Sequence, residues 1–139
     1  MVSSRRPTSL TTTATAASVH DHPCFRSCSR RTLAQLERSG TCVAVAPGGV
    51  LQRRQRTQWV YFVLSGTVAV DAGEDAFLVG AGGTIGLAAA FASGAPVLGI
   101  DAATTAVVYV VSREDLRAIA LANPALLEQL AMALAHHPT

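Results

Sequence analysis

The middle of the chain alternates short apolar segments with glycine-rich turns, and this pattern limits the fold more than any other feature. The clearest apolar segment, residues 59–64, is rich in the aromatic and β-branched residues that favour strands. Ser65-Gly66 follows it, and residues 80–83 contain three glycines, so both places are typical of turns. Many short strands at regular spacing between such turns predict a β-sandwich or barrel.

The sequence predicts seven short strands with helices on either side of them. We predict strands at residues 42–45, 50–51, 59–64, 67–70, 77–79, 84–85 and 106–111. Ser29 is a suitable N-cap for a helix over residues 30–39, which Gly40 ends. Ser112 caps a second helix, and Asn123-Pro124 separates it from a third. A short helix at residues 87–91 interrupts the strands.

Length and composition predict one folded domain. The chain has 139 residues, of which 50% are hydrophobic and 14% charged, enough apolar material for a core without disulfides or a metal. No apolar run reaches the roughly 18–20 residues of a membrane span. The first twenty residues hold nine Ser or Thr, two Arg and no acid. We therefore expect a disordered tail over residues 1–22, with a transit peptide as the alternative, and a domain over residues 23–139.

Five segments resemble known motifs in the same order. Residues 46–49 (Ala-Pro-Gly-Gly) are similar to a Pro-Ala-Gly-Glu turn, and residues 61–68 to a Tyr-Phe-Val-Leu-Ser-Gly-Ser-Val strand and turn. Residues 82–86 resemble Gly-Asp-x-Phe-Gly, residues 110–116 a last strand with its exit helix, and Asn123-Pro124 a frequent helix break. These motifs belong to the cyclic-nucleotide-binding domain, a mainly β fold with flanking helices. The resemblance covers residues 24–136 and implies a β-roll with one N-terminal and two C-terminal helices.

The resemblance also implies a phosphate site, which this sequence lacks. In the family, a short helix and an Arg hold the cyclic phosphate, and a Glu after the glycine holds the ribose. The Glu position is Leu87 here, and the Arg position falls at Pro96 or Val97. No Lys or Arg occurs between Thr57 and Ser112, so no shift of the alignment supplies a base. A hydrogen bond to a charged group contributes about 1.5–3 kcal/mol, so we expect no micromolar binding of cyclic AMP or cyclic GMP.

The degenerate cassette is expected to line a pocket of the roll. Its residues are Ile85, Gly86, Leu87, Ala88, Ala89, Pro96, Val97 and Leu98. Asp101 lies on the strand that should line this pocket, where its charge would oppose an anion. Either the chain's own side chains fill the pocket, or it accepts an apolar ligand. We favour the filled pocket, because small apolar residues pack readily.

Two surfaces are candidate interfaces. Arg53, Arg54 and Arg56 form the densest charge cluster, and they are either a contact for an acidic or phosphate-bearing partner or part of a solvated loop. The last helix carries an apolar stripe made of Leu126, Leu127, Leu130 and Leu134. The stripe either mediates self-association or packs on the roll, and we favour packing.

The sequence contains no set of residues that predicts a metal site, a cofactor site or a catalytic site. Cys24, Cys28 and Cys42 are too few for the four ligands of a typical iron–sulfur cluster, so we interpret them as buried thiols in a reducing cytoplasm. No His occurs between His22 and His136, so a cupin-type metal site and a Ser-His-acid triad both lack their His. We expect no enzymatic activity.

These observations predict a stand-alone regulatory or adaptor module that acts by contacting another protein. A sensor for a non-standard cyclic nucleotide or an apolar ligand is the second hypothesis. A self-associating structural domain, forming a homo-oligomer, is the third. Relatives among bacterial transcription factors carry a DNA-binding helix-turn-helix beyond the dimer helix. Because the chain ends at Thr139, we expect no DNA binding by this chain alone.

Overall fold

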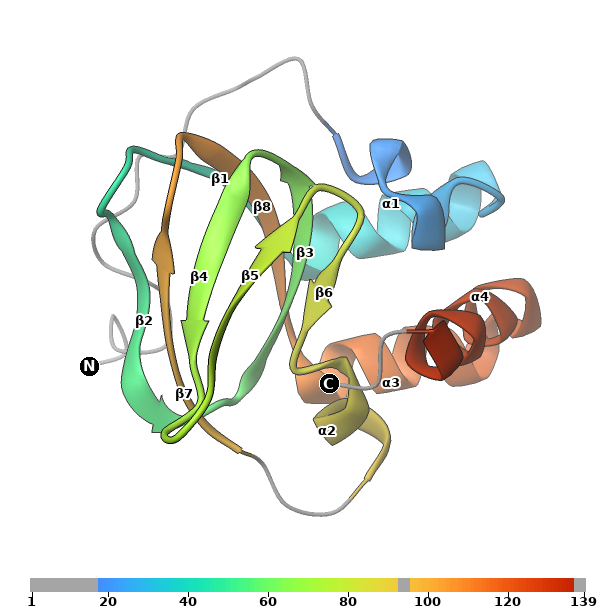
Figure 1. Cartoon of the computed structure of the whole chain (residues 1–139). Coiled ribbons are helices and arrows are strands. Elements are labelled where there is room, and N and C mark those ends of the chain that lie inside the picture. The colour runs from blue at the N-terminus through green and yellow to red at the C-terminus, as the bar shows by residue number, and fades with distance from the viewer. Residues whose placement is uncertain (1–17, 93–95, 137–139) are drawn as a thin grey trace.

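The computed structural model describes residues 18–92 and 96–136, and two antiparallel sheets dominate it (Figure 1). One sheet has the strand order β1-β8-β3-β6, and the other has the order β2-β7-β4-β5. The strands are β1 (Thr41–Val45), β2 (Val50–Arg56), β3 (Trp59–Ser65), β4 (Thr67–Asp71), β5 (Ala76–Gly80), β6 (Thr84–Ile85), β7 (Val97–Ala102) and β8 (Ala106–Ser112). The predicted β-roll is confirmed.

The helices gather on the β1-β8-β3-β6 side of the roll (Figure 1). They are the 3₁₀ turns η2 (Val19–Asp21) and η3 (Pro23–Phe25) and the α-helices α1 (Arg30–Ser39), α2 (Leu87–Phe91), α3 (Arg113–Ala122) and α4 (Pro124–His136). The predicted caps are present. The Thr32 N–H donates to Ser29 Oγ, and the Asp115 N–H donates to Ser112 Oγ, so each serine satisfies one free amide of a first turn.

The sheet that contains β3 and β8 is buried on both faces. Tyr61 and Val63 face the opposite sheet, whereas Val60 and Phe62 face the helices. Successive side chains of a strand point to opposite faces, so a strand between two cores must be apolar at every position. This arrangement explains the unbroken apolar run of residues 59–64, and it gives the domain two separate hydrophobic cores.

Folded structure begins earlier than the boundary predicted at residue 23. Val19 and His22 are both buried, and Val19 belongs to the core beneath the helices. Phe25 has no exposed surface, and its ring centroid lies 4.6 Å from that of Phe62. The segment therefore packs on β3 as part of the domain. Residues 1–17 of the predicted tail lie outside the described residues.

His22 joins this segment to the turn before β6. The Cys24 N–H donates to His22 Nδ1 at 3.1 Å, which leaves the ring proton on Nε2. His22 Nε2 then donates to the Gly83 carbonyl oxygen, also at 3.1 Å. Burial lowers the pKa of His22, the bond to Gly83 partly opposes this shift, and the charge of Arg26 adds to it. His22 is thus held as the neutral imidazole.

We expect acid to destabilise the fold through His22. The unfolded chain takes up this proton near pH 6.5, whereas the folded chain resists it, so stability rises with pH in this window. The contribution is complete above about pH 6.5 and is lost as the pH falls through the lower pKa of the folded state. Urea unfolding between pH 7.5 and pH 5.5 measures the slope, which the His22→Asn variant should reduce. Equal slopes for wild type and His22→Asn would contradict the assignment.

Candidate ligand-binding site of the roll

The residues of the degenerate cassette do not converge on one cavity. Ile85 and Leu98 belong to the core between the two sheets. Leu87 and Ala90 belong instead to the core between sheet and helices. Ala89 is buried, Ala88 is half-buried, and Pro96 and Val97 are exposed. The predicted pocket lining is therefore divided between two cores and the surface.

The start of α2 lies directly against the strands beneath it. Gly86 precedes the helix with φ of 80°, a left-handed conformation that favours glycine. A Cβ at this position would be 3.0 Å from the Trp59 carbonyl oxygen and 3.6 Å from Thr57 Cγ2. The glycine thus permits a close approach of two backbone segments. Its role in the structure is this close packing.

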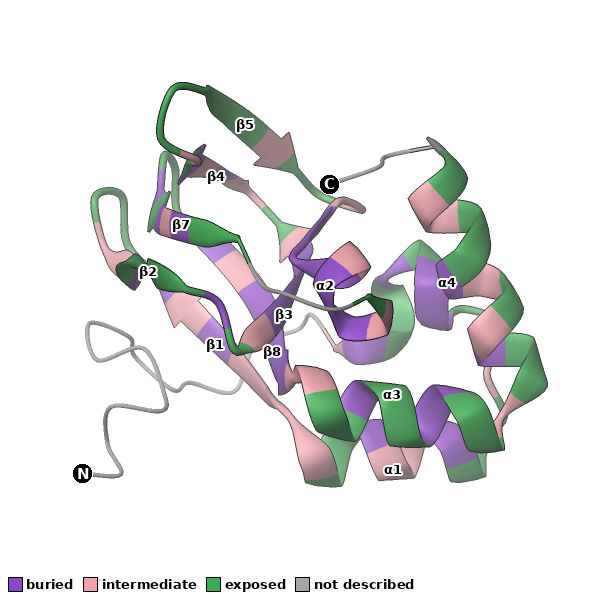
Figure 2. Ribbon diagram, turned by 90° about the horizontal axis from the view of Figure 1, so that it is seen from below, coloured by how far each residue is buried: buried purple, intermediate pink, exposed green. Residues whose placement is uncertain are grey.

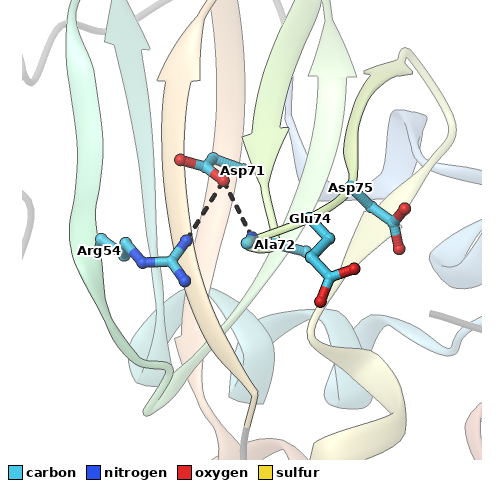
Figure 3. A pocket seen from close by; sticks show the side chains of 6 residues that line it. Arg54, Asp71, Ala72, Glu74 and Asp75 are labelled. Atoms are coloured by element: carbon cyan, nitrogen blue, oxygen red, sulfur yellow. Dashed lines mark hydrogen bonds and ion pairs between the residues drawn. The ribbon is translucent and has the colours of Figure 1, made fainter.

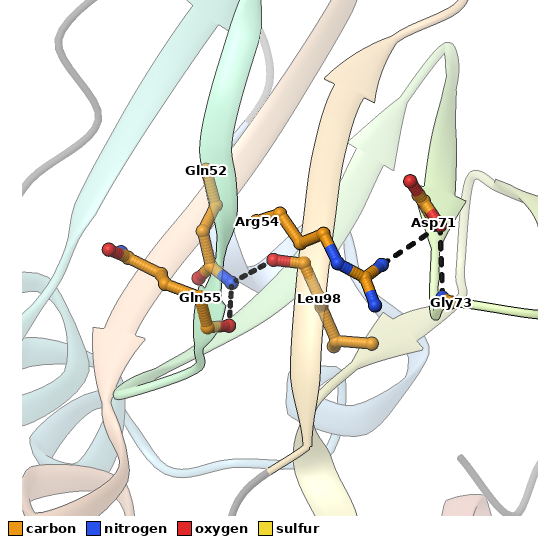
Figure 4. A network of polar contacts seen from close by, with 6 residues as sticks. All are labelled: Gln52, Arg54, Gln55, Asp71, Gly73 and Leu98. Atoms are coloured by element: carbon orange, nitrogen blue, oxygen red, sulfur yellow. Dashed lines mark hydrogen bonds and ion pairs between the residues drawn. The ribbon is translucent and has the colours of Figure 1, made fainter.

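A buried polar network occupies the roll beside this helix. Gln52, Thr57 and Tyr61 are all buried. Gln52 Nε2 donates to the Leu98 carbonyl oxygen at 2.8 Å and to the Gln55 carbonyl oxygen at 3.4 Å (Figure 4). Gln52 Oε1 accepts from the Tyr61 hydroxyl at 2.9 Å and lies 3.1 Å from Thr57 Oγ1. The side chains of β2 and β3 therefore satisfy one another inside the roll.

This network leaves no buried polar group ready for a ligand. Among the described residues, every buried side-chain nitrogen or oxygen has a hydrogen-bond partner. Burial raises the pKa of Tyr61 above its ordinary value, so its hydroxyl stays protonated and donates to Gln52. A ligand that displaced Gln52 would have to replace its hydrogen bonds, since an unpaired buried polar group costs about 1–3 kcal/mol. The arrangement favours the filled pocket over an apolar ligand site.

Two arginines of α3, Arg113 and Arg117, donate hydrogen bonds to the C-terminal end of α2. Arg117 Nε donates to the Ala90 carbonyl oxygen at 2.8 Å, and Arg113 Nη1 donates to the Ala89 carbonyl oxygen at 3.5 Å. These carbonyl groups lie at the C-terminal end of the short helix, where cationic groups are favourable. Arg113 and Arg117 therefore fasten α2 to α3.

Asp101 does not face the roll interior as expected. Its side chain is exposed, whereas Ile100 and Ala102 on either side of it are buried. Alternation along β7 places Asp101 on the outer face of the sheet. The expectation that Asp101 would repel an anion in the pocket is therefore wrong.

The segment that contains Arg53, Arg54 and Arg56 is a strand and not the solvated loop considered above. All three residues are exposed on β2, an edge strand that pairs with β7. Arg54 reaches across the sheet to β4, where its Nη1 lies 3.2 Å from Asp71 Oδ1. Asp71 Oδ1 also accepts the Gly73 N–H at 2.9 Å. The arginine cluster as a partner contact remains a prediction.

A shallow hollow with mixed charge surrounds this ion pair (Figure 3). Arg54, Asp71, Glu74 and Asp75 line it, together with Ala72 and Gly73. The side chains of Arg54 and Asp71 are 51% and 60% exposed, so water screens their attraction. An exposed pair of this kind contributes about 0–1 kcal/mol. Arg54 thus faces acidic residues of its own chain.

The three cysteines pack around the core beneath the helices as free thiols. Burial raises the pKa of Cys24 to about 11, with a further contribution from Cys28. Burial also raises the pKa of Cys28 and of Cys42. Thiolates are the form that ligates metals and attacks disulfides, so these environments disfavour both reactions. Within residues 18–92 and 96–136, no three His, Cys, Asp or Glu residues are grouped to hold a metal ion.

The leucine stripe of α4 packs on the chain itself. Leu126 and Leu130 are fully buried, and Leu127 and Leu134 are partly buried against the same core. Leu126 and Leu130 therefore have no surface to offer to a second copy. In the part of the chain that the structure describes, no helix is both long enough and apolar enough to cross a membrane.

The sequence pattern does not predict Gln52, Thr57 or Tyr61 as site residues. Leu51 and Gln52 are adjacent in β2, and both are buried. The pairing of β2 with β7 shifts register between Val50 and Gln52 and again between Gln52 and Gln55. Such a bulge breaks the alternation of inward and outward side chains, so the sequence pattern does not reveal an inward glutamine.

Comparison with solved structures identifies the fold. No protein-family model and no curated protein matches the chain. The sensor domain of the transcriptional regulator DNR from Pseudomonas aeruginosa is 19% identical, with a TM-score of 0.70 over 84% of this chain and 88% of that chain. The catabolite activator protein of Thermus thermophilus is 21% identical, with a TM-score of 0.63 over 82% of this chain.

A third similar structure is the C-linker/CNBHD of zELK channels, crystallised in the presence of cAMP. It is 24% identical, with a TM-score of 0.63 over 85% of this chain. The chain spans 62% of that structure and 57% of the catabolite activator protein. Two antiparallel sheets with flanking helices, a short helix before β7 and these similarities agree, and the chain therefore has the fold of a cyclic-nucleotide-binding domain.

Proposed function

We propose that this chain is a regulatory or adaptor module that acts by contacting another protein and does not bind cyclic AMP or cyclic GMP in the usual way. The observation that carries the second part of the proposal, the absence of cyclic-nucleotide binding, is the buried network of Gln52, Thr57 and Tyr61 beside α2. The stretch from Thr57 to Ser112 without Lys or Arg adds to it. An anionic ligand at this place would meet satisfied neutral groups and no base.

The energetic cost of these two features is large. Hydrogen bonds to charged groups contribute about 1.5–3 kcal/mol each, and an arginine often makes two of them to a phosphate. Losing two such bonds weakens binding by roughly two to four powers of ten. Displacement of Gln52 would add the cost of leaving the Tyr61 hydroxyl without its partner. Both effects act against micromolar affinity.

Isothermal titration calorimetry with cyclic AMP and cyclic GMP tests the proposal. We expect no saturating heat at micromolar concentrations from wild type. The Val97→Arg variant places a base at one of the two exposed positions, Pro96 and Val97, where the family arginine falls. We expect this variant not to bind either nucleotide at micromolar concentrations while Gln52 fills the site. Micromolar affinity of wild type would contradict the proposal, and micromolar affinity of Val97→Arg would show that the missing base alone prevents binding.

A thermal-shift screen separates the module from a sensor. A ligand that binds only the folded state stabilises it by RT ln(1 + [L]/Kd), so the melting temperature rises with the logarithm of ligand concentration above Kd. We expect no shift with a panel of nucleotides and small apolar compounds. A ligand-specific shift that grows with the logarithm of concentration, and that Gln52→Ala abolishes or alters, would favour the sensor hypothesis instead.

A further inference from the structure

The outer edge of β5 is exposed. Its residues differ in charge and in regularity of pairing from those of β2, the strand at the opposite edge of the same sheet. β5 comes last in the order β2-β7-β4-β5, and among the described residues only β4 pairs with it. Leu78 is 67% exposed and Phe77 is 37% exposed. Figure 2 shows β5 as an exposed strand at the margin of the molecule. An edge strand of this kind carries a row of unpaired N–H and C=O groups.

β2 has the features that prevent edge pairing. It carries Arg53, Arg54 and Arg56, and its register with β7 shifts twice. Charged side chains and bulges are the devices by which proteins block association at sheet edges. β5 has neither device, because residues 76–80 contain no charge and no proline and pair with β4 in unbroken register. The sheet is thus protected at one edge and unprotected at the other.

We propose that two copies of this chain associate by antiparallel pairing of β5 with β5. Pairing centred on Leu78 places the two Leu78 side chains opposite each other. Phe77 of each copy then faces Val79 of the other, and Ala76 faces Gly80. The acidic residues Glu74 and Asp75 fall opposite the uncharged Ala81-Gly82 turn, so no like charges face each other.

The second copy is the occupant that this edge fits. An uncharged strand that matches itself in antiparallel register needs no partner of special sequence. The contact is isologous, so it uses the β5 edge of both copies and closes at a dimer. It also covers Leu78, an exposed large hydrophobic residue of the described chain. This surface is separate from the α4 stripe, whose Leu126 and Leu130 are buried. The inference does not depend on whether the roll binds a ligand.

Sedimentation velocity over a micromolar to millimolar concentration series tests the dimer. We expect wild type to shift from one chain mass to twice that mass, and Leu78→Lys to remain at one chain mass throughout. The matched control is Leu121→Lys, because Leu121 on α3 is 65% exposed and lies away from the sheet edge. This variant should dimerise like wild type.

A charge exchange tests the proposed register. The Leu78→Lys and Leu78→Glu chains should each be monomeric and should form a dimer when mixed at low salt, because the two positions face each other across the twofold axis. A strictly monomeric wild type would overturn the proposal. Equal loss of dimer in Leu78→Lys and Leu121→Lys, or a series of species larger than dimers, would overturn it as well. None of these outcomes bears on the calorimetric test of the roll.

Discussion

The Leu87→Glu substitution is expected to unfold much of the protein and not to restore a nucleotide site. Leu87 has no exposed surface, and its side chain belongs to the core beneath the helices. Loss of the leucine packing costs about 2–5 kcal/mol. A buried carboxyl group without a partner adds about 1–3 kcal/mol even when it is protonated. The sum is comparable with the roughly 5–15 kcal/mol that stabilises a whole domain.

Urea unfolding of Leu87→Glu beside Ala88→Glu measures this effect. Ala88 is the next residue of α2 and is half-buried, so the same new side chain can reach water there. We expect a small change for Ala88→Glu and a large loss for Leu87→Glu. Burial raises the pKa of a carboxyl group at position 87. The difference in free energy of unfolding between wild type and Leu87→Glu should therefore become smaller as the pH falls from 7 to 5. Equal stability of the two variants would contradict the placement of Leu87 in the core.

The Gly66→Ala substitution should have the other large effect. Gly66 turns the chain from β3 into β4 with φ of 80°. A Cβ there would lie 2.1 Å from the Thr105 carbonyl oxygen and 2.7 Å from Ala106 Cα, so a backbone segment would have to move. Strain at such a φ costs about 1–3 kcal/mol, and forced overpacking adds about 1–3 kcal/mol. We expect the melting temperature to fall accordingly.

Gly48→Ala is the control for backbone strain alone. Gly48 has φ of 84°, close to that of Gly66, but a Cβ at this position would have no atom within 4 Å. The stability lost by Gly48→Ala should therefore come from backbone strain alone. The difference between the two variants then measures the collision with residues 105 and 106. If both variants lost the same stability, the close packing of β3 and β8 at this turn would be ruled out.

The sequence predicts those parts of the fold that local signals determine. Ser29 and Gly40 define α1 because an N-cap and a terminating glycine act within a few residues. The run of residues 59–64 identifies β3 because every position is apolar or aromatic. By contrast, the extension of β2 through Arg53–Arg56 has no periodic pattern. Those residues form a strand because they pair with β7.

The parts of the site that depend on distant contacts could not be predicted. Gln52 is directed inward by a bulge, and its partner Leu98 is 46 residues away. His22 is buried because it reaches Gly83, which is 61 residues away. The resemblance gave Leu87 a position in a ligand cassette, but only the packing decides which of two cores its side chain enters.

The attachment of α2 to α3 restricts the conformations that α2 can adopt. A switch needs two conformations of similar free energy, and a ligand must favour one of them. Any outward shift of α2 would break the bonds from Arg113 and Arg117 to its last carbonyl groups and would withdraw Leu87 from the core. Because the shifted conformation would lose both these hydrogen bonds and the packing of Leu87, we expect the observed position of α2 to be the more stable one.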